Sequence, residues 1–201
     1  MSNCMSPFSK AYWLAAACEF RSVRKLAVGA LIAALGVAVQ TLFIPLPVLG
    51  GQRIYFSFLV YALGAVVYGP LMGMTVGIVG DLVGAIFFPS GAFFIGYTIT
   101  AAVGGFLYGI MFYRVRLSIL RIALGKLAVN LLANTVLNSL WSAILAGGGF
   151  GVLVIARLPK NLLMIPVEVL LLSLVFGLLI PVFRQERLIT WQPIDRQLTW
   201  F

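Results

Sequence analysis

The chain has 201 residues, of which 62% are hydrophobic and 9% are charged, with a formal net charge of +9. Its mean hydropathy is +1.10. A soluble domain needs far more charged side chains to cover its surface, so this composition excludes a soluble protein and indicates an integral membrane protein. A helix needs roughly 20 apolar residues to cross a hydrocarbon core of about 30 Å. Six such helices with short loops would nearly fill the chain, so we expect one all-α membrane domain over residues 24–184.

The apolar runs are long and continuous, which favours transmembrane helices over a β-barrel with its short alternating strands. In chain order, the expected spans cover about residues 26–43, 54–67, 71–88, 92–112, 127–146 and 159–183. Tyr68-Gly69-Pro70 predicts a tight turn between the second and third spans. The chain has 21 glycines, which in membrane helices allow neighbouring backbones to approach closely.

Lysine and arginine predict the orientation of the spans. With six spans both termini lie on one side, which then holds 11 of the 14 basic residues. These are Lys10, Arg21, Arg24, Lys25, Arg114, Arg116, Arg121, Lys126, Arg184, Arg187 and Arg196. The positive-inside rule therefore places segment 1–23 and tail 185–201 in the cytoplasm. The apolar run 11–18 is short and is followed by basic residues, so we do not expect it to be a cleaved signal peptide.

Three cations remain on the predicted outer side: Arg53, Arg157 and Lys160. Each lies near the start of a span, next to glycine or proline. One interpretation is that they snorkel to the interface, as long basic side chains often do. The other is a basic ring at the outer mouth of a pocket. The second gains weight because the predicted outer loops carry no acidic residue, so these cations would attract an anion.

Two acids, Asp81 and Glu168, lie within predicted spans. A charged side chain at the bilayer centre costs roughly 2.5–3.5 kcal/mol, so it must be paired or face protein. One predicted helix face repeats every four residues and holds Gly69, Gly73, Gly77 and Asp81. Another holds Arg157, Asn161, Met164 and Glu168. The glycine face should pack against other helices with Asp81 pointing inward. Each acid either hydrogen-bonds a neighbouring helix or belongs to a site.

Asparagines recur every four residues along the fifth predicted span, at Asn130, Asn134 and Asn138. Three amides on one face would be unfavourable against lipid. They either bind neighbouring helices or form the polar wall of a ligand cavity. Trp141, near the predicted outer end, either stacks on a flat ligand or anchors at the headgroups.

The residue inventory excludes several enzyme classes. The chain contains no histidine, which rules out a Ser-His-Asp triad, a His-Glu-x-x-His zinc site and a histidine relay. It has two cysteines, too few for a metal cluster, and no Gly-x-x-x-x-Gly-Lys phosphate loop. Asp81 and Glu168 lack the glycine-rich flanks of an intramembrane protease. We therefore expect no metal, no cofactor and no catalytic activity.

Several motifs occur in an order that resembles one known family. They are 51–54 (Gly-Gln-Arg-Ile), 88–94 (Phe-Pro-Ser-Gly-Ala-Phe-Phe), 96–98 (Gly-Tyr-Thr), 105–109 (Gly-Phe-Leu-Tyr-Gly), 134–141 and 157–162 (Arg-Leu-Pro-Lys-Asn-Leu). This order resembles the folate family of substrate-binding S components of energy-coupling-factor (ECF) vitamin transporters. The resemblance covers roughly residues 24–184, and the motifs at 88–94 and 157–162 are the most specific.

The resemblance implies a six-helix S component that captures a folate-like vitamin from outside. It would then dock onto one membrane T subunit and two cytoplasmic ATPases. In that family a strip of small residues on the first helix faces the T subunit, here Ala30, Ala34 and Ala38. The expected ligand-binding residues are Arg53, Asp81, Phe93, Phe94, Tyr97, Asn134, Asn138, Trp141, Arg157, Lys160 and Asn161. The cations suit a carboxylate tail, the aromatic rings a flat heterocycle, and the amides and Asp81 its polar edge.

Two other functions stay open at this point. A membrane enzyme acting on a lipid-linked substrate would turn over alone, whereas an S component binds without chemistry. A self-sufficient secondary transporter would need no ATPase. Such transporters are often built from inverted repeats, and six short spans without an evident repeat argue against this alternative.

Overall fold

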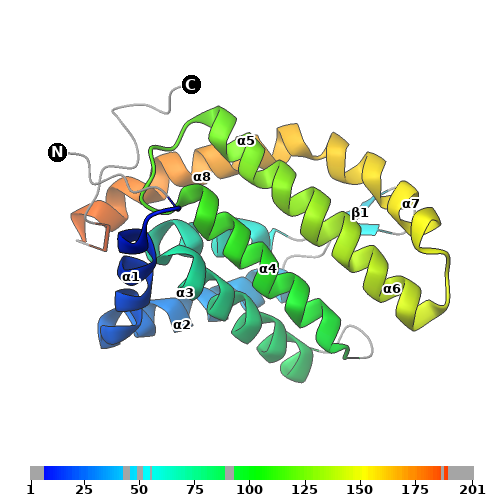
Figure 1. The fold of residues 1–201 in the computed structure, drawn as a ribbon, viewed down its shortest axis with the longest axis horizontal. Helices are drawn as coiled ribbons and strands as arrows, with labels where there is room; N and C mark the ends of the chain where they lie inside the picture. The colour runs from blue at the N-terminus through cyan, green and yellow to red at the C-terminus, as the bar shows by residue number, and fades with distance from the viewer. Residues whose placement is uncertain are drawn as a thin grey trace.

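The computed structural model describes residues 7–42, 46–48, 52–54, 56–88, 93–186 and 188–189, with backbone only for 42, 46–48 and 52–54. Its elements are α1 (Lys10–Cys18), η1 (Glu19–Arg21), α2 (Val23–Leu42), β1 (Leu46–Val48), β2 (Gln52–Ile54), α3 (Ser57–Phe87), α4 (Ile95–Phe112), α5 (Ile119–Ala128), η3 (Val129–Leu137), α6 (Asn138–Ala146), α7 (Phe150–Leu163) and α8 (Ile165–Gln185). The long helices form a bundle, and α1 lies across one end of it (Figure 1). In the described part, five helical segments are long and apolar enough to span a membrane. The predicted helical membrane fold is confirmed, with a short antiparallel β1–β2 hairpin in addition.

Helix α3 is a hairpin of two legs. At Gly69 the backbone leaves the helical region, with φ 82° and ψ −173°. A Cβ built on Gly80 would lie 2.5 Å from the hydroxyl of Tyr61. In a straight helix, Tyr61 and Gly80 would be separated by about 28 Å along the axis. The predicted turn at Gly69 is thus confirmed, and α3 supplies two of the six predicted helices. The leg from Ser57 to Tyr68 rises only about 18 Å at 1.5 Å per residue.

The second leg of α3 packs against α4 through the predicted glycine face. A Cβ on Gly73 would lie 2.7 Å from the carbonyl oxygen of Gly105, and one on Gly77 would lie 2.5 Å from that of Ala101. Only glycine permits such an approach. Further along the same face, the hydroxyl of Thr98 donates a hydrogen bond of 2.6 Å to Asp81. Asp81 therefore points toward α4, as its spacing from the glycines predicts.

Two span boundaries predicted from the sequence are wrong. The fifth span begins at Ile119 and runs through α5, the π-helical η3 and α6 to Ala146. Lys126, counted above among the cytoplasmic cations, therefore lies inside a helix, where it is 1% exposed. The sixth span begins at Ile165, because α7 ends at Leu163 and forms a separate helix before α8. The Arg157–Glu168 face is thus divided between two helices.

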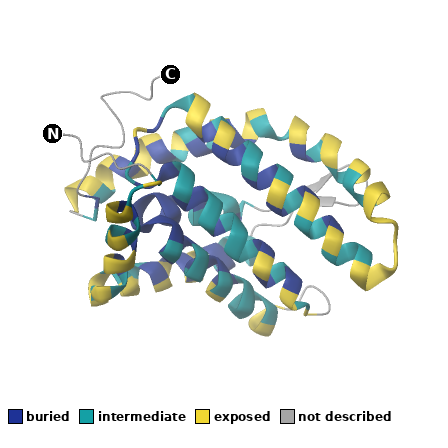
Figure 2. Cartoon of the chain, viewed as in Figure 1, coloured by how far each residue is buried: buried dark blue, intermediate teal, exposed yellow. Residues whose placement is uncertain are grey.

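The buried core lies where α3 meets its neighbours, whereas exposed residues cover the outside of the bundle (Figure 2). Buried side chains also fix α1 to the bundle end. Tyr12, fully buried, donates to the carbonyl of Gly109 at 3.0 Å. Glu19, only 5% exposed, forms an ion pair with Lys25 and accepts a 2.8 Å hydrogen bond from Tyr113. Burial and the nearby Glu19 raise the pKa of the Tyr113 phenol.

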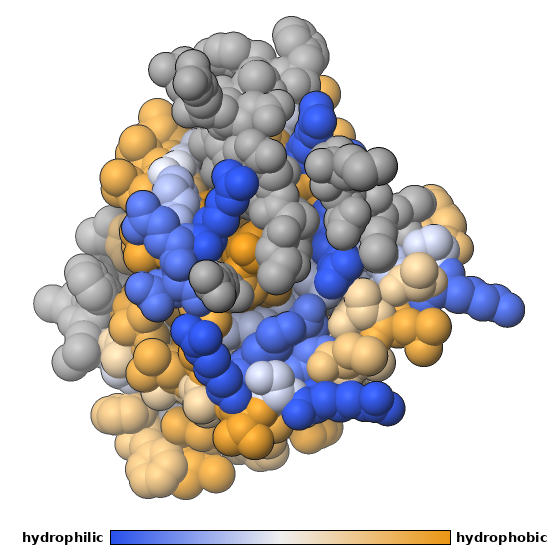
Figure 3. Space-filling view, turned by 90° about the vertical axis from the view of Figure 1, so that its left-hand side faces the viewer, coloured by the Kyte–Doolittle hydropathy of each residue, from blue (hydrophilic) through white to orange (hydrophobic). Residues whose placement is uncertain are grey.

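This end of the molecule is polar on its surface. Arg24 donates to the carbonyl of Glu186 at 3.2 Å, which joins the start of α2 to the end of α8. Figure 3 shows this end, with hydrophilic side chains gathered in the middle and hydrophobic residues around them. Such a distribution is typical of a bundle end at the membrane surface.

Candidate functional site

One polar cavity of about 630 Å³ lies inside the bundle. Residues from α2, α3, α4, α5, η3, α6, α7 and α8 line it, and we call it the site cavity. They are Gln40, Ser57, Phe58, Tyr61, Asp81, Tyr97, Thr100, Ala101, Gly104, Gly105, Tyr108, Lys126, Val129, Ala133, Asn134, Asn138, Arg157, Lys160, Asn161 and Glu168. The volume suits a small organic ligand. Seven of the eleven predicted ligand-binding residues line this cavity: Asp81, Tyr97, Asn134, Asn138, Arg157, Lys160 and Asn161.

A buried ion pair forms one part of the cavity wall. The ammonium of Lys126 lies 3.3 Å from the Glu168 carboxylate and donates to the hydroxyl of Tyr108 at 3.2 Å. It also lies 3.8 Å from the centre of the Phe58 ring, a cation–π contact. The ammonium therefore has an anion, a hydroxyl and an aromatic face as partners, which offset the cost of its burial.

Asparagines connect this ion pair to the helices around it. The Asn130 amide donates to Glu168 at 2.7 Å and to the carbonyl of Asn161 at 3.1 Å, while Asn134 donates to Asn130 at 2.9 Å. Asn161 in turn donates to Thr135 at 2.7 Å. Asn130 thus bridges helices, while Asn134 and Asn138 line the cavity.

The two cations of α7 reach the cavity from another side. Arg157 donates to Ser142 of α6 at 2.7 Å, and the hydroxyl of Tyr97 lies 3.4 Å from the same Ser142 oxygen. Burial lowers the pKa of Lys160; Glu168 opposes that decrease, and Arg157 adds to it. Burial also lowers the pKa of Arg157. Both positive charges are thus partly removed from water. In this less polar surrounding they interact more strongly with an anion than they would in water.

The predicted aromatic residues are divided between the interior and the surface. The Trp141 indole donates to Thr100 of α4 at 3.0 Å, and its ring centre lies 5.9 Å from that of Phe94. Trp141 is therefore packed against α4 next to a residue of the cavity wall. Phe93 is 57% exposed, and like Phe94 and Trp141 it is not one of the residues that line the cavity. The side chain of Arg53 lies outside the described residues.

The prediction omitted several residues of the cavity. Lys126 is counted with the cytoplasmic cations, because it comes just before the predicted start of the fifth span. An ionisable residue within an apolar run was the available signal, since such residues often mark functional sites in membranes. Glu168 is predicted to lie within a span but is not among the predicted ligand-binding residues. Nothing in the sequence pattern distinguishes Tyr61 and Phe58 from aromatic residues of a helix core.

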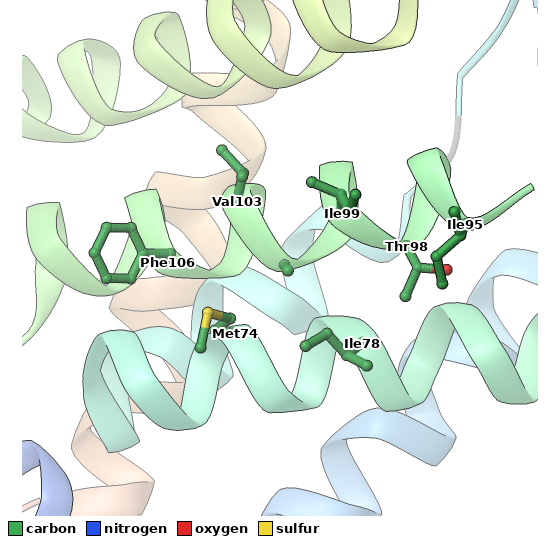
Figure 4. A pocket seen from close by; sticks show the side chains of 8 residues that line it. Met74, Ile78, Ile95, Thr98, Ile99, Val103 and Phe106 are labelled. Atoms are coloured by element: carbon green, nitrogen blue, oxygen red, sulfur yellow. The ribbon is translucent and has the colours of Figure 1, made fainter. Parts of the chain in front are cut away.

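A second hollow lies between the second leg of α3 and α4, with a volume of about 490 Å³. Figure 4 shows the side chains that line it, among them Met74 and Ile78 on α3 and Ile99, Val103 and Phe106 on α4. Thr98 is the one polar residue among those that line it. It therefore lacks groups to orient a charged ligand, and we assign the site to the larger cavity.

The predicted alanine strip faces away from the bundle. Ala30 and Ala34 are exposed and Ala38 is half-buried. Ile32, Ala33 and Val37, which lie close to the strip in the sequence, are buried against the bundle. The strip is thus available for contact with another membrane helix.

Comparison with known proteins agrees with this architecture. Residues 24–176 match the family profile "ECF transporter, substrate-specific component". A protein of Clostridium novyi (strain NT) named "Folate transporter FolT" is 36% identical over 120 residues, which cover 60% of this chain and 70% of that protein. One of the same name from Leuconostoc mesenteroides subsp. mesenteroides is 32% identical over 123 residues, 58% and 66% of the two chains. The solved structure "Crystal structure of FolT bound with folic acid" aligns with a TM-score of 0.65 at 27% identity, covering 74% of this chain and 88% of that one.

Proposed function

Because this chain belongs to the family of substrate-specific components of ECF transporters, we propose that it captures folate or a folate derivative outside the cell for ATP-driven uptake. Membership of this family makes it a multi-pass membrane transport subunit rather than an enzyme. The observation that carries the proposal is the site cavity, which has two cations on α7 and aromatic and amide groups elsewhere. Relatives named as folate transporters support this choice of ligand.

The ligand fits the cavity by its chemistry. Folate has a flat heterocycle with hydrogen-bond donors and acceptors at one end and carboxylates at the other. Arg157 and Lys160 bind the carboxylates, since guanidinium and ammonium groups form strong charge-assisted hydrogen bonds with them. Asp81, Asn134, Asn138 and Asn161 bind polar atoms of the ligand, and Tyr97 contacts its rings. Arg53, Phe93, Phe94 and Trp141 complete the site in this proposal.

Uptake requires partners in this proposal. One membrane T subunit binds the strip of Ala30, Ala34 and Ala38, and two cytoplasmic ATPases supply the energy. Both termini lie in the cytoplasm, because Lys10, Arg21, Arg24 and other cations cluster toward that side. Segment 1–23 and tail 185–201 are the cytoplasmic extensions of a membrane domain over residues 24–184.

An uptake assay tests the proposal. Cells that lack folate uptake are given this chain alone, or together with the T subunit and ATPases of its own genome, and labelled folic acid is added. We expect accumulation only with the complete set, and its loss when the ATPases are inactivated. Accumulation by the chain alone would favour a secondary transporter, and no accumulation with the complete set would contradict the proposal.

A further inference from the structure

Two of the described acids line the site cavity, and they differ in how their carboxylates are engaged. Glu168 uses both oxygens: Lys126 lies 3.3 Å from one, and Asn130 donates to the other at 2.7 Å. Asp81 accepts one hydrogen bond through Oδ2, from the hydroxyl of Thr98. Its Oδ1 has no partner within the described chain, yet it is not one of the buried oxygens in that state. Oδ1 is therefore accessible, on a side chain that lines the cavity.

Thr98 holds the Asp81 carboxylate from the neighbouring helix. Its hydroxyl lies 2.6 Å from Oδ2, and Thr98 itself is only 5% exposed. About one helical turn away, a Cβ on Gly77 would lie 2.5 Å from the carbonyl oxygen of Ala101, so the backbones of α3 and α4 are in contact there. This contact fixes the spacing of the two helices beside the hydrogen bond. Thr98 is not among the residues that line the site cavity, so it acts on a ligand there through Asp81.

A carboxylate held in place is a better acceptor than a mobile one, because less conformational entropy is lost when a ligand binds. On the basis of the proposed function, we propose that Thr98 is a positioning residue. It holds Oδ2 of Asp81 so that Oδ1 accepts a hydrogen bond from an N–H group of the ligand's heterocycle. Such a bond to a carboxylate is charge-assisted and therefore strong. The acid also repels the ligand's carboxylates, so the heterocycle lies toward α3 and α4 and the carboxylates toward α7.

The test is Thr98→Val, which removes the hydroxyl and keeps the branched shape of the side chain. We expect folic acid and 6-methylpterin each to bind about tenfold more weakly, the usual effect of one lost hydrogen bond. The fragment p-aminobenzoylglutamate lacks the heterocycle and should compete as well as against the parent. Thr98→Ser keeps the hydroxyl and should bind like the parent.

Thr75→Val is the matched control. Thr75 lies on the same leg of α3 as Asp81, and its hydroxyl donates to the carbonyl of Met72 at 2.9 Å. It is not among the residues that line the site cavity. Its variant should therefore bind folic acid and both fragments like the parent.

A double variant separates positioning from packing. Asp81→Asn should by itself weaken folic acid binding about tenfold to a hundredfold, because the charge-assisted acceptor is lost. In that background Thr98→Val should cause no further loss, since no carboxylate remains to be held. Additive losses, or equal losses for the two fragments, would show that Thr98 only supports the fold and would overturn the inference. Parent-like folic acid affinity of Thr98→Val would also overturn it and leave the proposed function intact.

Thermal unfolding without ligand checks that each variant is folded. Thr98→Ala, which also lacks the hydroxyl, takes the place of Thr98→Val if the latter does not fold. A folded parent protein that binds no folic acid would overturn the proposed function, and the role of Thr98 with it.

Discussion

The ammonium of Lys126 lies 3.3 Å from the carboxylate of Glu168 inside the membrane domain, with side-chain exposures of 1% and 11%. The pair joins α5 to α8, and the Asn130 amide adds a hydrogen bond to the same carboxylate. Removing one member of such a pair leaves the other charge buried without its counterion. The pair therefore constrains the helices that surround the site cavity.

Breaking this pair should destabilise the protein. We expect Lys126→Met or Glu168→Gln alone to lower the free energy of unfolding by about 3–5 kcal/mol, the usual cost of an uncompensated buried charge. The double variant Lys126→Met/Glu168→Gln should lose less stability than either single variant, because no uncompensated charge remains. Thermal unfolding in detergent measures all three. Single variants as stable as the parent would mean that water reaches the pair.

The α7 cations should contribute to ligand affinity. A charge-assisted hydrogen bond in a partly desolvated site contributes roughly 1.5–3 kcal/mol, or about tenfold to a hundredfold in affinity. Arg157→Ala and Lys160→Ala should each weaken folic acid binding by that order, while Arg121→Ala, at an exposed position of α5, should not. Titration of each purified variant, with gel filtration as a check of folding, measures the effect. Parent-like binding by both α7 variants would make these cations interfacial anchors only.

Two adjacent glycines of α4 should tolerate alanine very differently. A Cβ on Gly105 would lie against the carbonyl group of Gly73, whereas a Cβ on Gly104 meets nothing within 4 Å. Gly105→Ala should therefore lower the free energy of unfolding by about 1–3 kcal/mol, because the added methyl group overpacks the helix contact. Gly104→Ala should be neutral or stabilising, because alanine favours the helix. Unfolding without ligand distinguishes them, and equal stability would contradict the close contact between α3 and α4.

The alanine strip should matter for assembly rather than for ligand binding. Ala34→Trp places a bulky side chain on an exposed face that we propose to contact the T subunit. We expect co-purification with the T subunit to fall while folic acid affinity stays at the parent value. Leu178→Trp, at a 71% exposed position of α8, is the control and should assemble normally. Parallel loss of binding and assembly in Ala34→Trp would show that the strip supports the fold.

Cysteine labelling tests the orientation. Cys18, at the α1 end, is exposed, and the loop that contains Gly148 lies at the opposite end of the bundle (Figure 1). In a Cys4→Ser background, Cys18 should react with an impermeant thiol reagent only after lysis. Gly148→Cys in a background without native cysteines should react in intact cells. The reverse pattern would place both termini outside.

The sequence allowed much of this architecture to be predicted. Hydropathy predicted the membrane helices, and Gly69-Pro70 predicted the turn within α3. The four-residue spacing of the glycines predicted that Asp81 points toward a neighbouring helix, which is α4. Local pattern could not place Lys126, since a lysine that follows three arginines is typical of a loop, and its tertiary partner Glu168 is distant in the chain. The break between α7 and α8 was missed for a similar reason: an apolar run shows length but not where one helix ends and the next begins. Tyr61 has no local signature, because its place in the cavity wall depends on Gly36 and Gly80, which come from other segments.

Direct titration of folic acid into the purified protein tests the central claim most simply. Isothermal calorimetry in detergent gives stoichiometry and affinity without any partner subunit, and riboflavin serves as a control vitamin without carboxylates. We predict saturable binding of one folic acid per chain and no heat of binding with riboflavin. A monodisperse, thermally stable protein that binds no folic acid, or binds riboflavin equally well, would contradict the account.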